Sequence, residues 1–232
     1  MMCSNTNISF TSRCQSIEMA RSACRKITMF STTKNQHTVQ KLKQTNREAM
    51  EFFEDYAYMP EYTRGSKMFN MLNSYMNCSN KLVSDRKHFG DKADLVGVQN
   101  LLQHIKTKHV GNCGESAEGL SAILAMNGVE NAYFTTIKNG ESAVDHEICV
   151  FNRDGSVFDG EIKNNKTIII DAWLGIVDFA NTALKQIKAA GAKYLYLNPY
   201  KDVTIDTRNI GKFDLSKREI DVLRELHPEF VI

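Results

Sequence analysis

Three side chains in this chain of 232 residues are of the types that together carry out thiol chemistry: Cys113, His146 and Asp171. A cysteine attacks a carbonyl carbon as its thiolate, which a helix N-terminus and a nearby imidazole both stabilise. A histidine takes up the thiol proton, and a carboxylate holds the histidine ring in the correct tautomer. The three residues therefore predict an acyl-transfer enzyme, provided that the fold brings them together.

The sequence around Cys113 predicts that this residue begins a helix. Asn112 suits the N-cap position, and Glu115 follows three residues later, as in a capping box. The apolar pattern continues to Asn127 and Gly128, a typical C-terminal stop. The positive end of the helix would then favour the thiolate, and the backbone N–H of Cys113 would point toward a developing oxyanion.

His146 is expected on a strand that covers residues 144–151. Strict alternation would place His146, Ile148 and Val150 on one face of this strand. We expect that apolar face to point toward the core and toward the helix of Cys113. The imidazole would then be able to reach the thiol.

Asp171 ends a strand expected over residues 167–171, whose three consecutive isoleucines indicate burial. A buried carboxylate costs free energy unless it is paired, and His146 is the natural partner. Asp171 on its own could instead cap the turn before Trp173. The segment between His146 and Asp171 has room for a further hairpin, so Asp159 stays open as an alternative third member of the triad.

Three short motifs around these residues resemble the Cys, His and Asp motifs of the papain-like/transglutaminase-like superfamily of cysteine enzymes. They are Gly-Asn-Cys-Gly-Glu at 111–115, Asp-His-Glu-Ile-Cys-Val at 145–150 and Ile-Ile-Asp-Ala-Trp at 169–173. They are especially similar to the corresponding signatures of bacterial toxins and injected effectors. The resemblance spans about residues 110–175.

This resemblance implies an α+β fold in which a central helix carrying the cysteine packs on an antiparallel sheet that bears the histidine and the aspartate. It implies Cys113 as the nucleophile, His146 as the base and Asp171 as the residue that orients the base. Papain-like enzymes also place an oxyanion-binding glutamine shortly before the nucleophile. In this chain, Gln103 and Asn112 are the candidates for that role.

Members of the superfamily include peptidases, glutamine deamidases, transglutaminases and acyltransferases, so the motifs indicate the chemistry better than the substrate. We expect hydrolysis of a protein amide bond by a cysteine peptidase or a glutamine deamidase, with a host protein as a candidate substrate. A transglutaminase and a thioester-dependent acyltransferase are alternatives of the same class. A non-catalytic module that binds a partner protein is the alternative of a different class. Trp173, the only tryptophan, would form a wall of the substrate slot or pack in the core beside Asp171.

The N-terminal part of the chain differs in composition from the remainder. Residues 1–37 are basic and rich in Ser, Thr and Asn, and we interpret them as an extension. Such an extension could be a secretion signal for a bacterial injection system, a mitochondrial-type presequence or a solvated tail. Residues 38–232 are expected to form the catalytic domain, in which 38–110 is a helical subregion. The expected location is the cytosol of a host cell after injection, or otherwise the cytoplasm.

Composition and residue spacing argue against several other classes of protein. With 42% hydrophobic residues the chain can bury one sizeable core, but no apolar run approaches the roughly 20 residues of a transmembrane segment. The six cysteines form no CxxC pairs and no regular spacing with histidines, so we expect no metal. Because the sequence has no phosphate-binding glycine loop and no basic stripe with interleaved aromatics, we expect no cofactor and no nucleic-acid partner.

Hydrophobic periodicity and turn signals predict the remaining elements. Helices are expected over residues 17–27, 39–57, 68–76, 95–105, 113–127 and 177–190, the last capped by Asp178, and after a capping box at 216–219. Strands are expected over residues 132–137, 144–151, 156–158, 167–171 and 194–197, the first four as an antiparallel meander. The helix over 17–27 is interpreted as packed on the domain rather than bound to a membrane.

Overall fold

The described part of the computed structural model, residues 13–30, 95–108, 113–163, 165–195 and 197–232, is built around a five-stranded antiparallel sheet with the order β4-β3-β2-β1-β5. The strands are β1 (Ala132–Asn139), β2 (Ser142–Asn152), β3 (Thr167–Asp171), β4 (Ile176–Phe179) and β5 (Val203–Ile205). Strands β1 to β4 follow one another as a meander, and β5 returns to pair with β1.

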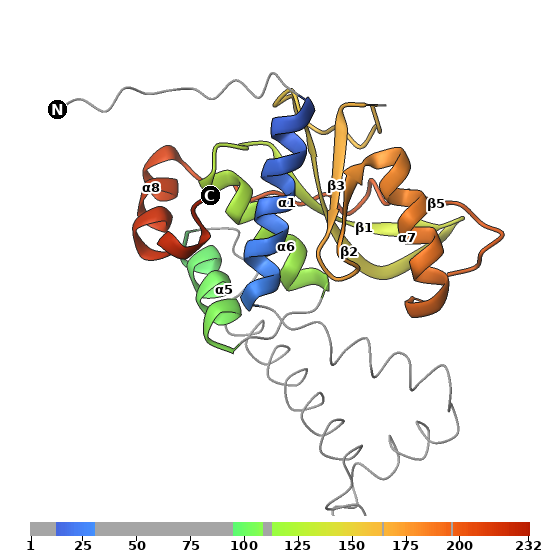
Figure 1. Cartoon of the computed structure of the whole chain (residues 1–232), viewed down its shortest axis with the longest axis horizontal. Helices are drawn as coiled ribbons and strands as arrows, with labels where there is room; N and C mark the ends of the chain where they lie inside the picture. The colour runs from blue at the N-terminus through green and yellow to red at the C-terminus, as the bar shows by residue number, and fades with distance from the viewer. Residues whose placement is uncertain (1–12, 31–94, 109–112, 164, 196) are drawn as a thin grey trace, which may run out of the picture.

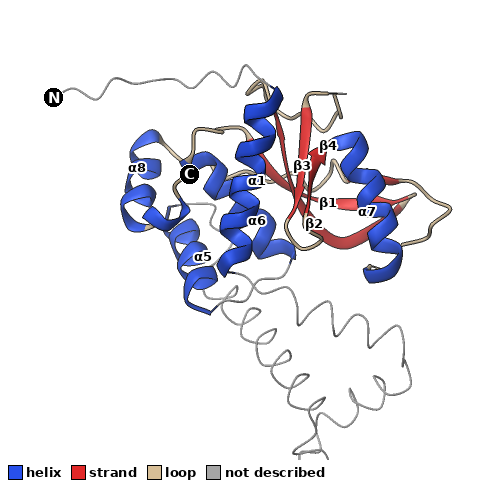
Figure 2. Ribbon diagram, in the orientation of Figure 1, coloured by secondary structure: helices blue, strands red, loops and turns tan. Residues whose placement is uncertain are grey.

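Helices cover both faces of this sheet, as Figures 1 and 2 show. They are α1 (Arg13–Phe30), α5 (Leu95–Lys108), α6 (Cys113–Met126), α7 (Ala180–Tyr194) and α8 (Lys217–Leu226), followed by the short 3-10 helix η1 (Pro228–Phe230). Helices α1 and α6 lie on one side of the strands, with α5 and α8 beside α6, and α7 lies on the other side. The expected α+β class, with the cysteine-bearing helix packed on an antiparallel sheet, is therefore confirmed.

Each face of the sheet has its own hydrophobic core. The core under α1, α5 and α6 includes Cys149 and Phe151 of β2. The core under α7 includes Ile148 and Val150 of the same strand. Successive residues of β2 thus serve opposite cores, as the pleat of a strand requires.

Helix α6 is fixed in place by close contact with two other helices. A Cβ atom added at Gly119 would lie 2.8 Å from a side-chain carbon of Ile27 on α1 and 2.9 Å from one of Ile105 on α5. The lack of a side chain at Gly119 therefore allows the three helices to approach one another. This packing holds the helix that begins with Cys113.

The helix expected over residues 17–27 is found as α1, and it packs on the domain as predicted. Ala20, Ala23 and Ile27 are fully buried and belong to the core that includes α6. The described part of the range 1–37 thus contributes to the same core as the sheet. The helices expected over 39–57 and 68–76 lie outside the described residues. Within the described ranges, no helix has the length and apolar character needed to span a membrane.

Two elements after β2 differ from the prediction. Residues 156–158, predicted as a strand, form a loop. Residues 177–179, predicted as the start of a helix capped by Asp178, belong to the strand β4, because Val177 pairs with Ile170 of β3. Helix α7 follows directly, without a side-chain cap. Pairing with a neighbouring strand overrides the local cap signal.

The last strand also differs from the prediction. Tyr194, predicted to begin a strand over 194–197, ends α7, and the backbone N–H groups of Leu195 and Leu197 bond to the carbonyl of Gly191 at the end of that helix. The strand that completes the sheet is β5, nearer the C-terminus. The C-terminal helix after the capping box is confirmed as α8, with both hydrogen bonds between Ser216 and Glu219 present.

Candidate active site

His146 and Asp171 form a buried pair. Nε2 of His146 and Oδ2 of Asp171 lie 2.7 Å apart, and each residue is 1% exposed. Because a carboxylate only accepts, Nε2 is the donor in this hydrogen bond. Nδ1 is then the ring nitrogen that remains for a second partner.

The thiol of Cys113 is a neighbour of the imidazole. Cys113 is the first residue of α6 and is half-buried, and its side chain lies near enough to His146 to raise the pKa of the ring. The first N–H groups of a helix have no partner inside the helix and carry its positive end. The structure thus brings all three predicted residues together at the start of α6, with the thiol as the least buried member.

The turn from β3 to β4 holds the other oxygen of the Asp171 carboxylate. The backbone N–H of Leu174 donates to Oδ1 of Asp171 at 2.9 Å. The next residue, Gly175, has φ of 72°, in the left-handed region that favours glycine. Asp171 therefore caps a turn and pairs with His146 at the same time, so both of its oxygens are bound.

Trp173 lies against the imidazole. The ring centroids of Trp173 and His146 are 5.4 Å apart with an edge-on arrangement, and Trp173 is 5% exposed. The indole belongs to the β3–β4 turn, so the turn that binds Asp171 also covers His146. Covering of this kind keeps water from the pair and strengthens its electrostatic interaction.

The surroundings of His146 change its affinity for a proton. Burial by itself lowers the pKa of His146, but the charge and hydrogen bond of Asp171 and the contact with Cys113 raise it more, to about 10. The ring is then mainly an imidazolium at neutral pH. A positive ring beside a thiol favours the thiolate and can later donate its proton to a leaving group.

The prediction of which face of β2 points toward α6 is wrong. Ile148 and Val150 pack under α7, on the side of the sheet opposite to α6. Regular alternation would place His146 on that side as well. His146 nevertheless lies near Cys113, the first residue of α6.

A shift in the pairing of β1 with β2 supplies the physical reason. Glu147 and Val144 pair with consecutive residues of β1, so Asp145 and His146 are two additional residues on β2. A bulge of this kind bends the strand and redirects the side chains within it. The bulge breaks the alternation at the residue on which the site depends, and the sequence pattern gave no sign of it.

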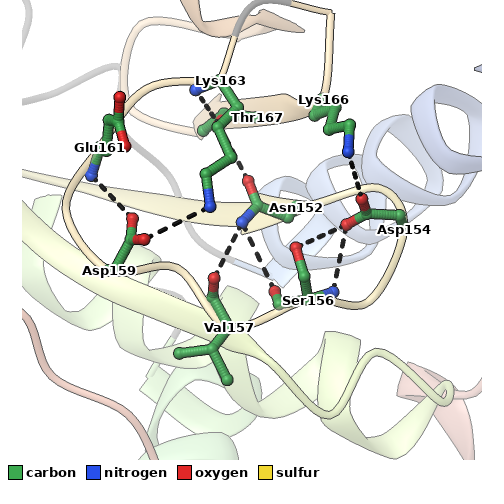
Figure 3. Close-up of polar contacts among 9 residues, drawn as sticks. All are labelled: Asn152, Asp154, Ser156, Val157, Asp159, Glu161, Lys163, Lys166 and Thr167. Atoms are coloured by element: carbon green, nitrogen blue, oxygen red, sulfur yellow. Dashed lines mark hydrogen bonds and ion pairs between the residues drawn. The ribbon is translucent and has the colours of Figure 1, made fainter.

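Asp159, the alternative third member, belongs to the connection between β2 and β3 (Figure 3). Its carboxylate accepts from the backbone N–H of Glu161 at 3.0 Å and pairs with Nζ of Lys163 at 3.3 Å, and its side chain is 54% exposed. The carboxylate bound to His146 is that of Asp171. The geometry therefore favours Asp171 as the residue that orients the imidazole.

Of the two candidates for the oxyanion role, only Gln103 lies in the described part of the chain. Gln103 lies on α5 with an exposed side chain, and its carbonyl accepts from the hydroxyl of Thr107. Asn112 lies outside the described residues. The N–H groups of the first turn of α6 remain the natural donors to an oxyanion.

Sequence reasoning overlooked two parts of the site. One is the turn donor Leu174 with Gly175 after it, which a glycine following an apolar strand could have indicated. The other is the thiol of Cys24 on α1: burial and the charge of Asp171 raise its pKa to about 11. No local signal predicts that proximity, because α1 is far from Asp171 in the sequence.

Within the described ranges, no group of three or more His, Cys, Asp or Glu side chains is arranged to hold a metal ion. Comparison of the chain with protein-family models, with curated proteins and with solved structures gives no match. The function is therefore argued from the geometry of the site and from the chemistry of its residues.

Proposed function

We propose that the protein is a thiol-dependent enzyme that hydrolyses protein amide bonds, as a cysteine peptidase or a glutamine deamidase. The observation that carries the proposal is the buried pair of His146 and Asp171 with the Cys113 thiol beside the same ring. A buried ion pair is costly to form and contributes little to stability. Such a pair beside a half-buried thiol at a helix N-terminus is the arrangement that thiol catalysis requires.

The reaction would use these residues in a fixed order. Sγ of Cys113, as the thiolate whose proton is on Nδ1 of His146, forms a bond to the amide carbonyl carbon. The C–N bond then breaks, and His146 gives its proton to the departing amine or ammonia. Water attacks the resulting thioester and yields a proton to His146, and the C–S bond breaks, which restores the thiolate and the imidazolium. Asp171 keeps the ring oriented and stabilises its positive charge in each step.

The same acyl-enzyme would support the alternatives named above. An amine in place of water gives transglutamination, and a thioester donor in place of an amide gives acyl transfer. We prefer hydrolysis of a protein amide because the motifs around Cys113, His146 and Asp171 resemble those of enzymes that act on proteins. Injection into a host cell stays a prediction from the sequence.

The test is intact-mass spectrometry of purified candidate proteins after incubation with the wild type or with Cys113→Ala. Fragments would indicate a peptidase, the mass gain of an amide-to-acid conversion a deamidase, and a joined species a transglutaminase. Each change should be absent with Cys113→Ala. If Cys113→Ala kept the full biological effect of the protein, the non-catalytic binding module would replace this proposal.

A further inference from the structure

We propose that the β3–β4 turn, residues 172–175, holds the pair of His146 and Asp171 in position, and we call this turn the clamp. We further propose that Gly175 is a positioning residue of this site. The inference rests on the proposed function, and it identifies the element on which the geometry of the site depends. Gly175 acts through the backbone of the turn and would contact neither the substrate nor the reacting atoms.

The turn is joined directly to the catalytic carboxylate. Asp171 is the last residue of β3 and pairs with Ile176, the first residue of β4, so the turn between them has four residues. Within this turn, the N–H of Leu174 holds Oδ1 of Asp171, and the ring of Trp173 lies against His146. A change in the path of the turn would therefore move a donor to Asp171 and the cover of His146 together.

Gly175 determines the path of the turn through its backbone conformation. Its φ of 72° is one that a residue with a Cβ rarely adopts. Space is not the obstacle, because a Cβ added at Gly175 would have no atom within 4 Å outside its own neighbourhood. Alanine at this position would therefore oppose the turn conformation alone and would cause no clash.

The groups that face the pair come from several elements. Asp171 of β3, the Cys113 thiol of α6 and the ring of Trp173 face His146. The charge of Asp171 also acts on the thiol of Cys24 on α1 and, after burial, raises its pKa. Among these groups, the Leu174 N–H and the Trp173 ring belong to the turn. A test of the clamp must therefore leave α1, α6 and the strands unchanged.

The chain offers a matched control for such a test. Gly155 lies in the turn after β2 and has φ of 74°, and a Cβ at Gly155 would also have no atom within 4 Å. It is placed near the opposite end of β3, about 13 Å along the strand from Asp171 at the usual rise per residue. Alanine at Gly155 therefore causes the same kind of backbone strain without touching the clamp.

The experiment measures two properties of the full chain: the pKa of His146 by NMR titration and the rate at which iodoacetamide alkylates Cys113. Gly175→Ala and Gly155→Ala should lower the melting temperature to a similar extent. Only Gly175→Ala should lower the pKa of His146, by about one unit or more, because Asp171 is held less firmly. The alkylation rate of Cys113 at neutral pH should fall about tenfold in the same variant.

Gly175→Asn supplies a second variant that tolerates the left-handed conformation better than alanine does. It should restore most of the pKa of His146 and most of the reactivity of Cys113. The inference is overturned if Gly175→Ala and Gly155→Ala give the same pKa and the same rate, or if asparagine restores neither. Both readouts are independent of substrate, so the clamp can be shown even if no amide is hydrolysed. Hydrolysis that survived Gly175→Ala unchanged would overturn the clamp and leave the proposed function standing.

Discussion

The connection that leads into strand β3 and the end of β3 carry carboxylates in opposite surroundings. Before β3 begins, Asp159 lies in an exposed connection and pairs with Lys163 at 3.3 Å (Figure 3). Where β3 ends, Asp171 is fully enclosed and pairs with His146 at 2.7 Å. Both are acid–base pairs, but only the second is shielded from water.

This difference in burial distinguishes a surface ion pair from a pair that can take part in proton transfer. Water and salt screen an exposed pair, so it adds little to the stability of the fold. In the enclosed pair, burial lowers the pKa of His146, but the charge and hydrogen bond of Asp171, together with Cys113, raise it more, to about 10. Because the pair is buried, water does not screen the charge of Asp171. The end of β3 at Asp171 can therefore set the protonation of His146.

The connection between β2 and β3 is held by a buried side chain of its own, the uncharged amide of Asn152. Asn152 is 1% exposed; its Nδ2 donates to the carbonyl of Val157 at 3.1 Å, and its Oδ1 accepts from the hydroxyl of Thr167 at 2.9 Å. This neutral network ties the connection to β2 and β3, as Figure 3 shows. The connection is therefore held by hydrogen bonds, and its surface ion pairs add little.

The largest expected effect is that of Asp171→Asn. An asparagine would keep the shape but would not stabilise the imidazolium, so kcat/KM should fall about 10²- to 10⁴-fold. The pKa of His146 should fall at the same time, which an NMR titration would report. Asp159→Asn is the matched control and should leave both quantities unchanged. Equal losses in the two variants would break the distinction between the two ends of β3.

Asn152→Ala should reduce stability without reducing activity. It leaves the part-buried carbonyl of Val157 and the buried hydroxyl of Thr167 without this partner, which costs about 1–3 kcal/mol in the free energy of unfolding. Urea denaturation measures the loss, and activity below the transition should match the wild type. The exposed Ser156→Ala should change stability by less than about 0.5 kcal/mol. A loss of activity comparable to that of Asp171→Asn would contradict the separation of roles.

The two ends of β3 should respond to opposite extremes of pH. Because the pKa of His146 is raised from 6.5 to about 10 in the folded protein, its contribution to stability is fully present below pH 6.5 and is lost as pH rises through about 10. The hydrogen bond from the Glu161 backbone lowers the pKa of Asp159, so its contribution is present above its ordinary value of 3.8 and is lost as pH falls below it. Urea denaturation across this range should show the alkaline loss in the wild type and not in Asp171→Asn.

Lys163→Met should have the smallest effect. The lysine is partly exposed, and its pair with Asp159 is open to solvent. We expect no measurable change in the urea midpoint or in activity, because exposed pairs contribute little. A clear loss of stability that disappeared at high salt would show that this surface pair matters more than its exposure suggests.

The sequence predicted the elements whose signals are local. The bounds of β3 follow from a short isoleucine run, and α8 follows from the capping box of Ser216 and Glu219, both of which need no distant partner. Cys113 begins its helix as predicted. By contrast, β4 forms because it pairs with β3, a long-range contact. The local sequence at Asp178 instead predicts the N-cap of a helix.

The site itself could be predicted in its residues but not in its geometry. Cys113, His146 and Asp171 follow from their types and motifs, and the structure brings them together. The prediction of which face of β2 points toward α6 was wrong. The bulge in β2 and the second core under α7 both result from tertiary packing, which the local pattern does not show. The support of Asp171 by Leu174 likewise depends on a turn whose conformation the sequence only hints at.

The most direct test of the central claim is the alkylation rate of Cys113 by iodoacetamide at neutral pH, followed by peptide mass spectrometry. Cys24 and Cys149 serve as internal controls, because burial raises the pKa of both thiols. If the buried pair activates the thiol, Cys113 should react faster than a free cysteine derivative and much faster than both controls, and His146→Ala should remove the advantage. A rate for Cys113 no greater than that of the free derivative, unchanged in His146→Ala, would contradict the account.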